Sequence, residues 1–138
     1  MRYFLKIDGI GGDSSTLPYL HWIEASSFDC ELTSMSVSAA RAVSTAKAHG
    51  GIVYFTANVD SSFPKLRFAL ISGKPIASAK FAGTSSSSLL QGTFTDFVIS
   101  SLQLIDGSAR SPRMKFSLRC NKINIEHGHV VAARIKRP

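Results

Sequence analysis

Alternation of apolar and polar residues is the strongest pattern in the chain, and it predicts β-strands with one buried face. Tyr3, Leu5 and Ile7 share one parity in the first of these strands, which a glycine-rich turn ends after Asp8. The segment 52–59 is rich in β-branched and aromatic residues, which favour strands. Further strands are expected over 20–28, over 31–38 either as its extension or as a separate strand, and over 76–82, 89–104, 113–126 and 130–135.

Two of the longest predicted strands change parity along their length. The apolar positions switch faces after Ile99 in the strand 89–104 and after Cys120 in the strand 113–126. The residues concerned are Phe97, Ile99, Leu102 and Leu104 in the first strand and Met114, Phe116, Leu118, Cys120, Ile123 and Ile125 in the second. Such a switch in neighbouring strands requires a β-bulge or a barrel corner. We therefore expect a mainly β protein, an antiparallel β-barrel of two packed sheets that is closed or nearly closed.

One external α-helix is expected over 63–72. Ser61 or Ser62 can cap its start, and Pro64 fits its first turn. Gly73 suits the left-handed residue that follows the last turn of a helix. These signals define both ends of the helix from local sequence alone.

The predicted helix carries two apolar faces. Leu66 and Leu70 form one stripe, whereas Phe68 and Ile71 point away from it. A surface helix normally has a single apolar face. The second face therefore has to be covered, either by another part of the same chain or by a second subunit.

The segment 39–51 shows no strong period. It contains alanine, serine and lysine together with the adjacent Gly50 and Gly51. We therefore expect a long exposed loop here, and loops of this length in a compact domain are often functional. The chain contains no internal repeat and no linker-like composition shift, so residues 1–138 are expected to form a single domain.

The composition fits a folded domain without a membrane span. Hydrophobic residues make up 44% of the chain and charged residues 18%, which excludes a disordered chain. No apolar run reaches the ~20 residues that cross a bilayer, so membrane insertion is not expected. Lys6 and Asp8 interrupt the apolar start of the chain, which is therefore not a cleavable signal peptide. We expect a cytoplasmic protein whose export would use another route.

The formal net charge of +7 suggests an alternative function, a basic β-barrel that binds nucleic acid. The basic residues are spread along the chain, and the only local excess is Arg134, Lys136 and Arg137. Nucleic-acid binders of this kind present aromatic side chains beside lysine and arginine on a sheet face. Most aromatic residues here fall on predicted core faces, so the pattern disfavours nucleic acid as a partner.

The sequence contains no constellation that predicts an enzyme, a cofactor or a metal site. His127 and His129 share a strand face, but no third ligand lies near them in sequence. The segment 9–12 lacks the spacing of a phosphate loop, and no nucleophile elbow is present. Cys30 and Cys120 are the only cysteines, and inert thiols are commoner than a disulfide in a cytosolic protein.

Five segments in order give the chain a resemblance to the Hcp family of type VI secretion tube proteins. They are Lys6–Ser14, His21–Glu24 with Ser27 and Phe28, Asp60–Leu66 with Ala69 and Ser72–Lys74, Phe97–Ser101, and Phe116–Glu126. The third segment resembles the family's helix, which typically reads Ser-Pro-Lys-Leu and ends in Ser-Gly-Lys. Phe63 departs from it, because the family usually has Ser or Thr before the proline. The segment 39–51 is also richer in alanine and serine than in glycine.

The resemblance implies a structural subunit rather than an enzyme. In this family, hexameric rings of barrels stack into a tube that lies inside a contractile sheath and is propelled into a target cell. Effector proteins ride in the lumen, and the subunit is itself exported. The implied partners are further copies of this chain together with the sheath, spike and effector proteins of the secretion machine.

A closed ring needs two different patches on each subunit, and stacking needs a projecting element. The exposed side of the predicted helix and the edges of the barrel are our candidates for the ring interface, and the segment 39–51 is our candidate for the projecting element. The predicted ring-interface residues are Phe63, Arg67, Phe68 and Ile71 on the helix, and Arg41, Lys47 and His49 in the segment before Ile52. Asp29 and Glu31 follow Phe28 on a strand and are our candidates for the lumen wall.

Overall fold

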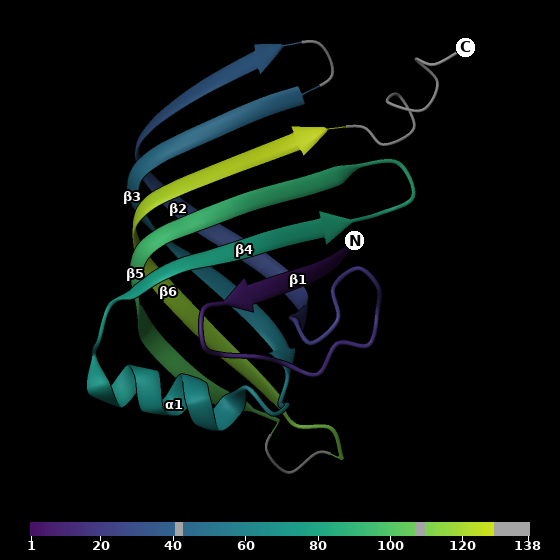
Figure 1. Ribbon diagram of the computed structural model, residues 1–138, viewed down its shortest axis with the longest axis vertical. Helices are drawn as coiled ribbons and strands as arrows, with labels where there is room; N and C mark the ends of the chain where they lie inside the picture. Colours follow the sequence, from purple (N-terminus) through teal and green to yellow (C-terminus); the bar gives the residue numbers. More distant parts are fainter. Residues whose placement is uncertain (41–42, 107–109, 129–138) are drawn as a thin grey trace.

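Six antiparallel strands close into one barrel in the computed structural model, which describes residues 1–40, 43–106 and 110–128 (Figure 1). The elements are β1 (Arg2–Ile7), β2 (Ile23–Ala40), β3 (Val43–Asn58), α1 (Phe63–Ser72), β4 (Ile76–Thr84), β5 (Leu89–Ile105) and β6 (Arg113–Gly128). The strand order around the barrel is β1-β2-β3-β6-β5-β4, and β1 pairs with β4 to close it. The expected mainly β barrel with one helix is confirmed. The strand expected over 130–135 lies outside the described residues.

A corner divides the barrel into two halves that enclose the core between them. β3, β6 and β5 all bend at this corner, on the left of Figure 1. At the bend the buried positions lie three residues apart instead of two, at Phe94 and Phe97 in β5 and at Cys120 and Ile123 in β6. This spacing keeps apolar side chains inside the barrel while the strands change direction. The two halves are parts of one continuous sheet rather than two separate sheets.

A β-bulge accounts for the parity change after Ile99 in β5. The register of β5 against β6 shifts between Ile99 and Ser101. Ser117, which is only 3% exposed, lies opposite this bulge. Its Oγ lies 2.7 Å from Ser100 Oγ and 2.5 Å from Ser101 Oγ. The sequence left a bulge and a corner as alternatives, and the structure has a bulge after Ile99 and the corner after Cys120. Hydroxyl groups satisfy one another where the ladder is irregular.

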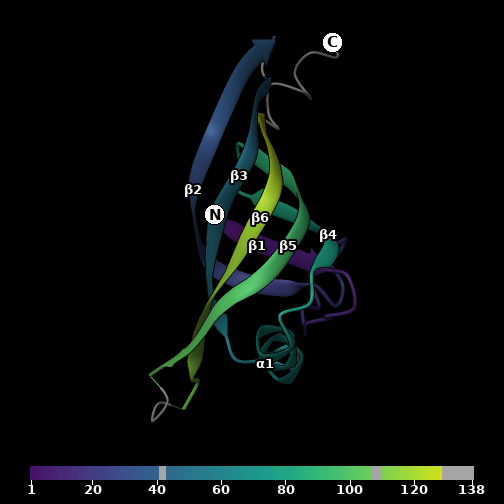
Figure 2. The same ribbon diagram turned by 90° about the vertical axis from the view of Figure 1, so that its left-hand side faces the viewer.

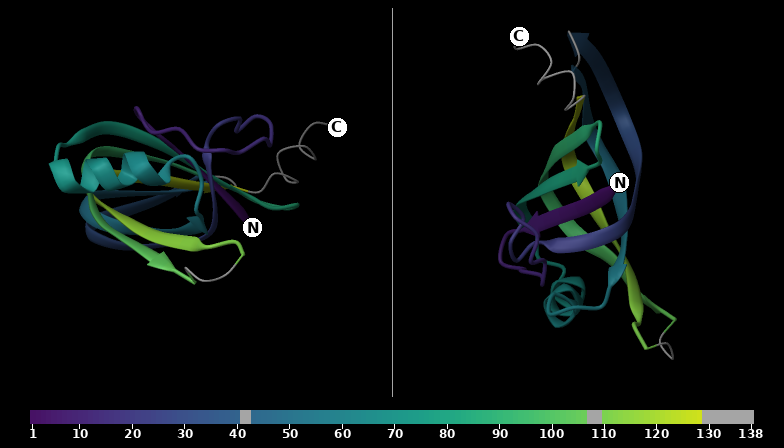
Figure 3. Two further views of the ribbon diagram at one scale, coloured as in Figure 1. Left: turned by 90° about the horizontal axis from the view of Figure 1, so that it is seen from below. Right: turned by 90° about the vertical axis from the view of Figure 1, so that its right-hand side faces the viewer.

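The expectation of a long loop over 39–51 is wrong, because this segment is part of a β-hairpin. Residues 43–48 of β3 pair with β2 on one side and with β6 on the other. Alanine and serine have weak strand propensities, but backbone hydrogen bonds to two neighbouring strands outweigh them. Arg41 lies outside the described residues. The β2–β3 hairpin reaches to the end of the molecule opposite α1 (Figure 3).

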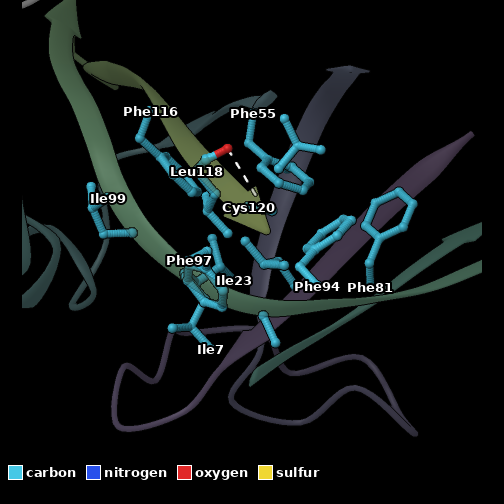
Figure 4. Close-up of a cluster of buried hydrophobic side chains, with 14 of the residues drawn as sticks. Ile7, Ile23, Phe55, Phe81, Phe94, Phe97, Ile99, Phe116, Leu118 and Cys120 are labelled. Atoms are coloured by element: carbon cyan, nitrogen blue, oxygen red, sulfur yellow. Dashed lines mark hydrogen bonds between the residues drawn. The ribbon is translucent and has the colours of Figure 1, made fainter. Parts of the chain in front are cut away.

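Phenylalanines from β3, β4, β5 and β6 form the centre of the core (Figure 4), and Phe28 of β2 packs against them. The Phe55 ring lies 5.4 Å from Phe28, 5.6 Å from Phe81 and 5.5 Å from Phe116, measured between ring centroids. Cys120 is buried beside this cluster, and burial raises the pKa of its thiol to about 12. Cys30 is half-buried, and both cysteines are free thiols.

Helix α1 lies outside the barrel, beside the lower part of β5 (Figure 2). Leu66 is completely buried and anchors the helix to the core. Gly73 adopts a left-handed conformation with φ 66°, and its N–H donates to the Ala69 carbonyl, as the sequence predicts. Ser62 occupies the N-cap position, but its hydroxyl contacts Asp60 instead of capping the helix.

Candidate assembly surfaces

Two unpaired strand edges flank one half of the barrel. Among the described residues, those at 26–40 of β2 pair only with β3, because β1 pairs with β2 no further than Ala25. Within the same described part of the chain, residues 98–105 of β5 pair only with β6, because β4 begins its pairing with β5 at Phe97. Together with β3 and β6, these two edge strands form a sheet in the order β2-β3-β6-β5. We call it the four-stranded sheet, and it consists of residues 26–32, 52–58, 113–119 and 98–105. Backbone donors and acceptors are thus available for pairing on both sides of this sheet.

The edge of β5 is accompanied by exposed apolar side chains. Leu104 lies opposite the buried Met114 on the core-facing side of β5, yet it is 52% exposed because no strand pairs beyond β5 there. On the neighbouring helix, Phe68 is 71% and Ile71 is 70% exposed. A mostly apolar hollow of about 390 Å³ lies beside Phe68. Exposed apolar groups of this kind mark interaction surfaces.

The outward side of the four-stranded sheet carries charges of both signs. Asp29 and Glu31 are exposed on β2, while Lys115 and Arg119 are exposed on β6. Tyr54 lies between the two strands, with Lys115 Nζ 5.8 Å from the centroid of its ring. A shallow hollow over this region is lined by the Asp29, Glu31, Tyr54 and Lys115 side chains, among others. This side therefore offers a polar surface rather than an apolar one.

The helix residues predicted for an interface differ in exposure. Arg67, Phe68 and Ile71 are exposed, whereas Phe63 is half-buried and packs against the core. Lys47 and His49 are exposed on β3 rather than in a loop. The sequence indicates barrel edges as interface candidates, but it does not indicate which strands form them or that Leu104 is exposed. Only the lengths of β1 and β4 relative to their neighbours create these features, and those lengths are visible only after the strands are paired.

A hydrogen-bonded junction ties the β1–β2 connection to the start of α1. Asp13 accepts hydrogen bonds from the backbone N–H and the hydroxyl of Ser61, and its own N–H donates to Asp60. Two hydrogen bonds from Ser61 lower the pKa of Asp13 from its usual value. The hydroxyl of Ser61 has the larger effect and its backbone N–H the smaller one. The junction therefore favours the ionised form of Asp13 and fixes the helix relative to the barrel.

Acidification is expected to weaken this junction. Since the pKa of Asp13 is lower in the folded than in the unfolded chain, its stabilising contribution is present above about pH 5 and is lost as the pH falls through the folded pKa. We expect the urea midpoint of wild type to exceed that of Asp13→Asn at neutral pH and the difference to shrink as the pH falls through the folded pKa of Asp13. Unfolding followed by tryptophan fluorescence over a series of pH values measures this. Asp8→Asn is the control, because no described residue hydrogen-bonds the Asp8 carboxylate. If the difference in urea midpoint between wild type and Asp13→Asn did not change with pH, the stabilising role of the Asp13 carboxylate would be contradicted.

The described residues offer no grouping typical of a metal centre. No three His, Cys, Asp or Glu side chains among them lie close enough to hold a metal ion. Of the predicted histidine pair, His127 is described and His129 is not. Within the described part of the chain, no helix is long and apolar enough to cross a membrane.

A closed antiparallel barrel with one external helix defines the class of fold, and comparisons with known proteins identify the family. The model of the family "Type VI secretion system effector, Hcp" matches residues 4–127. The chain therefore belongs to the Hcp family of type VI secretion proteins, a structural and non-enzymatic family of secreted proteins. No curated protein matches the sequence.

Solved structures have the same fold. Hcp1 from Salmonella typhimurium is 25% identical with a TM-score of 0.68, covering 95% of this chain and 88% of that one. Hcp2 from the same organism is 25% identical with a TM-score of 0.66, covering 86% and 79% of the two chains. A type VI secretion system effector from Yersinia pestis is 22% identical with a TM-score of 0.65, covering 88% and 85%. The last of these shows similarity of fold alone.

Proposed function

We propose that this protein is the subunit of the inner tube of a type VI secretion apparatus, forming hexameric rings that stack. The observation that carries the proposal is the pair of unpaired edges on opposite sides of the four-stranded sheet. Successive strands in the order β2-β3-β6-β5 are antiparallel, so β2 and β5 run in opposite directions. The β5 edge of one copy can therefore accept the β2 edge of the next copy as a further antiparallel strand.

Such head-to-tail pairing joins two different patches, which makes it a heterologous interface that closes into a ring when its rotation permits. Ring closure would pair both edges and remove the risk of uncontrolled strand addition. The Leu104 side chain and the exposed face of α1 with Phe68 and Ile71 lie beside the β5 edge. They would pack against the incoming copy, so the second apolar face of the helix would be covered by a subunit.

In this arrangement the core lies on one side of the four-stranded sheet and the lumen on the other. Asp29, Glu31, Tyr54, Lys115 and Arg119 would then line the lumen wall. A polar wall suits the passage and carriage of folded effector proteins, which have charged surfaces. The end of the β2–β3 hairpin, opposite α1, is our candidate for contact between stacked rings.

The proposed route is assembly in the cytoplasm followed by export through the apparatus. The partners would be further copies of the chain and the sheath, spike and effector proteins of the machine. The basic nucleic-acid-binding alternative is not favoured, because most of the phenylalanines that could stack on bases are buried in the core.

Purified protein is expected to form rings with sixfold symmetry. Negative-stain electron microscopy shows ring symmetry directly, and multi-angle light scattering gives the mass in solution. A particle six times the subunit mass of 14.9 kDa supports the proposal. A monomer at every concentration and at low salt would contradict it.

A further inference from the structure

A row of lysines crosses the half of the barrel that lies beyond the corner. Lys6 of β1 pairs in register with Lys80 of β4, Lys80 with Thr93 of β5, and Thr93 with Asn124 of β6. Asn124 in turn pairs with Lys47 of β3. Residues in register on adjacent strands share one face of the sheet. We call this outward surface the lysine face (Lys6, Lys47, Lys80, Thr93 and Asn124).

The positive charges of this face are not neutralised within the described chain. Lys6, Lys47 and Lys80 are all exposed, and none of them forms an ion pair with another described residue. The row covers four inter-strand steps, about 19 Å along the sheet. A groove lies beside Lys80, and Glu126 is the one negatively charged side chain among the described residues that line it. The face therefore presents a positive surface wide enough for a partner with several carboxylates.

An aromatic wall borders the lysine face. The β1–β2 connection places Tyr19 on Phe4, with ring centroids 4.4 Å apart, and Trp22 lies edge-on to Tyr19 at 5.0 Å. Phe4 is only 1% exposed, so this connection is fixed on the outside of the barrel. Tyr19 and Trp22 themselves remain half-exposed. They offer apolar area to a partner without a large ordering cost, because their positions are already set.

A groove of about 280 Å³ runs between the aromatic wall and the lysine row. Its lining includes the side chains of Tyr19, Trp22, Lys80, Gln91 and Asn124. Asn124 Oδ1 is buried and has no hydrogen-bond partner among the described residues. The enclosed Oδ1 is not open to a partner, so the groove combines positive charge with an aromatic wall.

We propose that the lysine face is a docking surface for an acidic protein segment. Carboxylates of the segment would pair with Lys6, Lys80 and Lys47, and an apolar side chain would pack on Trp22. This surface is separate from the two edges that close the proposed ring. If the four-stranded sheet lines the lumen, the lysine face belongs to the outer wall, where a protein surrounding the tube can reach it.

An acidic protein fits this face better than a nucleic acid does. Single-stranded nucleic acids bind aromatic rings that are free to stack face-on with bases. Here Trp22 and Tyr19 meet at an interplanar angle of 65°, and Tyr19 already stacks on Phe4. Glu126 in the groove would also repel a phosphate backbone, whereas a protein segment can place a donor beside it.

Trp22 provides a direct readout because it is the only tryptophan in the chain. The probe is a synthetic peptide that alternates glutamate and valine, and the comparison probes are the corresponding lysine peptide and an oligothymidine strand. We expect the acidic peptide to change Trp22 fluorescence saturably, with weaker binding as salt is raised. Lys80→Glu should lower its association constant by at least about tenfold, because it replaces attraction by repulsion.

Lys65→Glu is the matched control, since Lys65 is an exposed lysine on α1, away from the lysine face. It should change the association constant by less than about twofold. The inference is overturned by absence of a saturable Trp22 response, by an equal effect of Lys65→Glu, or by tighter binding of oligothymidine. Light scattering on the same samples keeps the two proposals apart. Rings that do not bind the peptide overturn the docking surface alone, and a monomer that binds it overturns only the ring.

Discussion

Replacing Leu104 by glutamate is expected to convert the assembled ring into a folded monomer. Leu104 lies on the core-facing side of β5 but is half exposed at the unpaired edge, beside α1. Covering a leucine side chain contributes about 2 kcal/mol, and burying an unpaired carboxylate costs several kcal/mol more. The loss occurs at every interface of the ring. Each association constant should therefore fall by more than about 100-fold.

Native mass spectrometry and light scattering at micromolar concentration measure this effect. Leu20→Glu is the matched control, because Leu20 is 47% exposed in the β1–β2 connection and carries the same change of side chain. We expect Leu20→Glu to remain a ring. Circular dichroism should show the same β-sheet content in both variants. Rings formed by Leu104→Glu as readily as by wild type would exclude the β5 edge as the assembly interface.

Replacing Phe55 by alanine is expected to destabilise the subunit by about 3–5 kcal/mol. Phe55 is only 1% exposed, and its ring contacts Phe28, Phe81 and Phe116 from three other strands. Truncation would remove these contacts and leave a cavity that the paired strands cannot collapse to fill. A loss of this size is a large part of the stability of an ordinary domain.

Urea unfolding measures the change, and it is best performed in the monomeric Leu104→Glu background, because assembly itself adds to apparent stability. Phe68→Ala is the control, since the same side chain is 71% exposed on α1. We expect a change within about 0.5 kcal/mol for this exposed position. Equal losses for Phe55→Ala and Phe68→Ala would show that the aromatic cluster is not the centre of the core.

Local signals in the sequence were sufficient for the helix and for the irregular strands. Pro64 and Gly73 act on the backbone of their own neighbourhood, so the bounds of α1 were predictable before any packing was known. The parity changes after Ile99 and Cys120 were equally visible, because apolar side chains have to reach the core on both sides of a bend. The family resemblance then supplied the expected ring.

The hairpin could not be predicted in the same way. Residues 43–51 include two alanines and two glycines and show no clear alternation of apolar and polar positions, so pairing with β2 and β6 is what defines this part of the strand. Gly51 illustrates this dependence, because a Cβ at this position would meet the Glu31 carbonyl oxygen. Nothing in the residues adjacent to Gly51 in sequence indicates that Glu31 lies there.

The sequence by itself therefore determined a mainly β domain with one helix, a bend in its longest strands and a resemblance to tube proteins. The tertiary structure alone decided which strand edges remain unpaired, where Leu104 becomes exposed and which lysines share a face. The physical reason is that a strand edge is defined by the partner it lacks. In this barrel the pairing of β1 with β2 stops at Ala25 and the pairing of β4 with β5 stops at Phe97, and local sequence carries no record of either point.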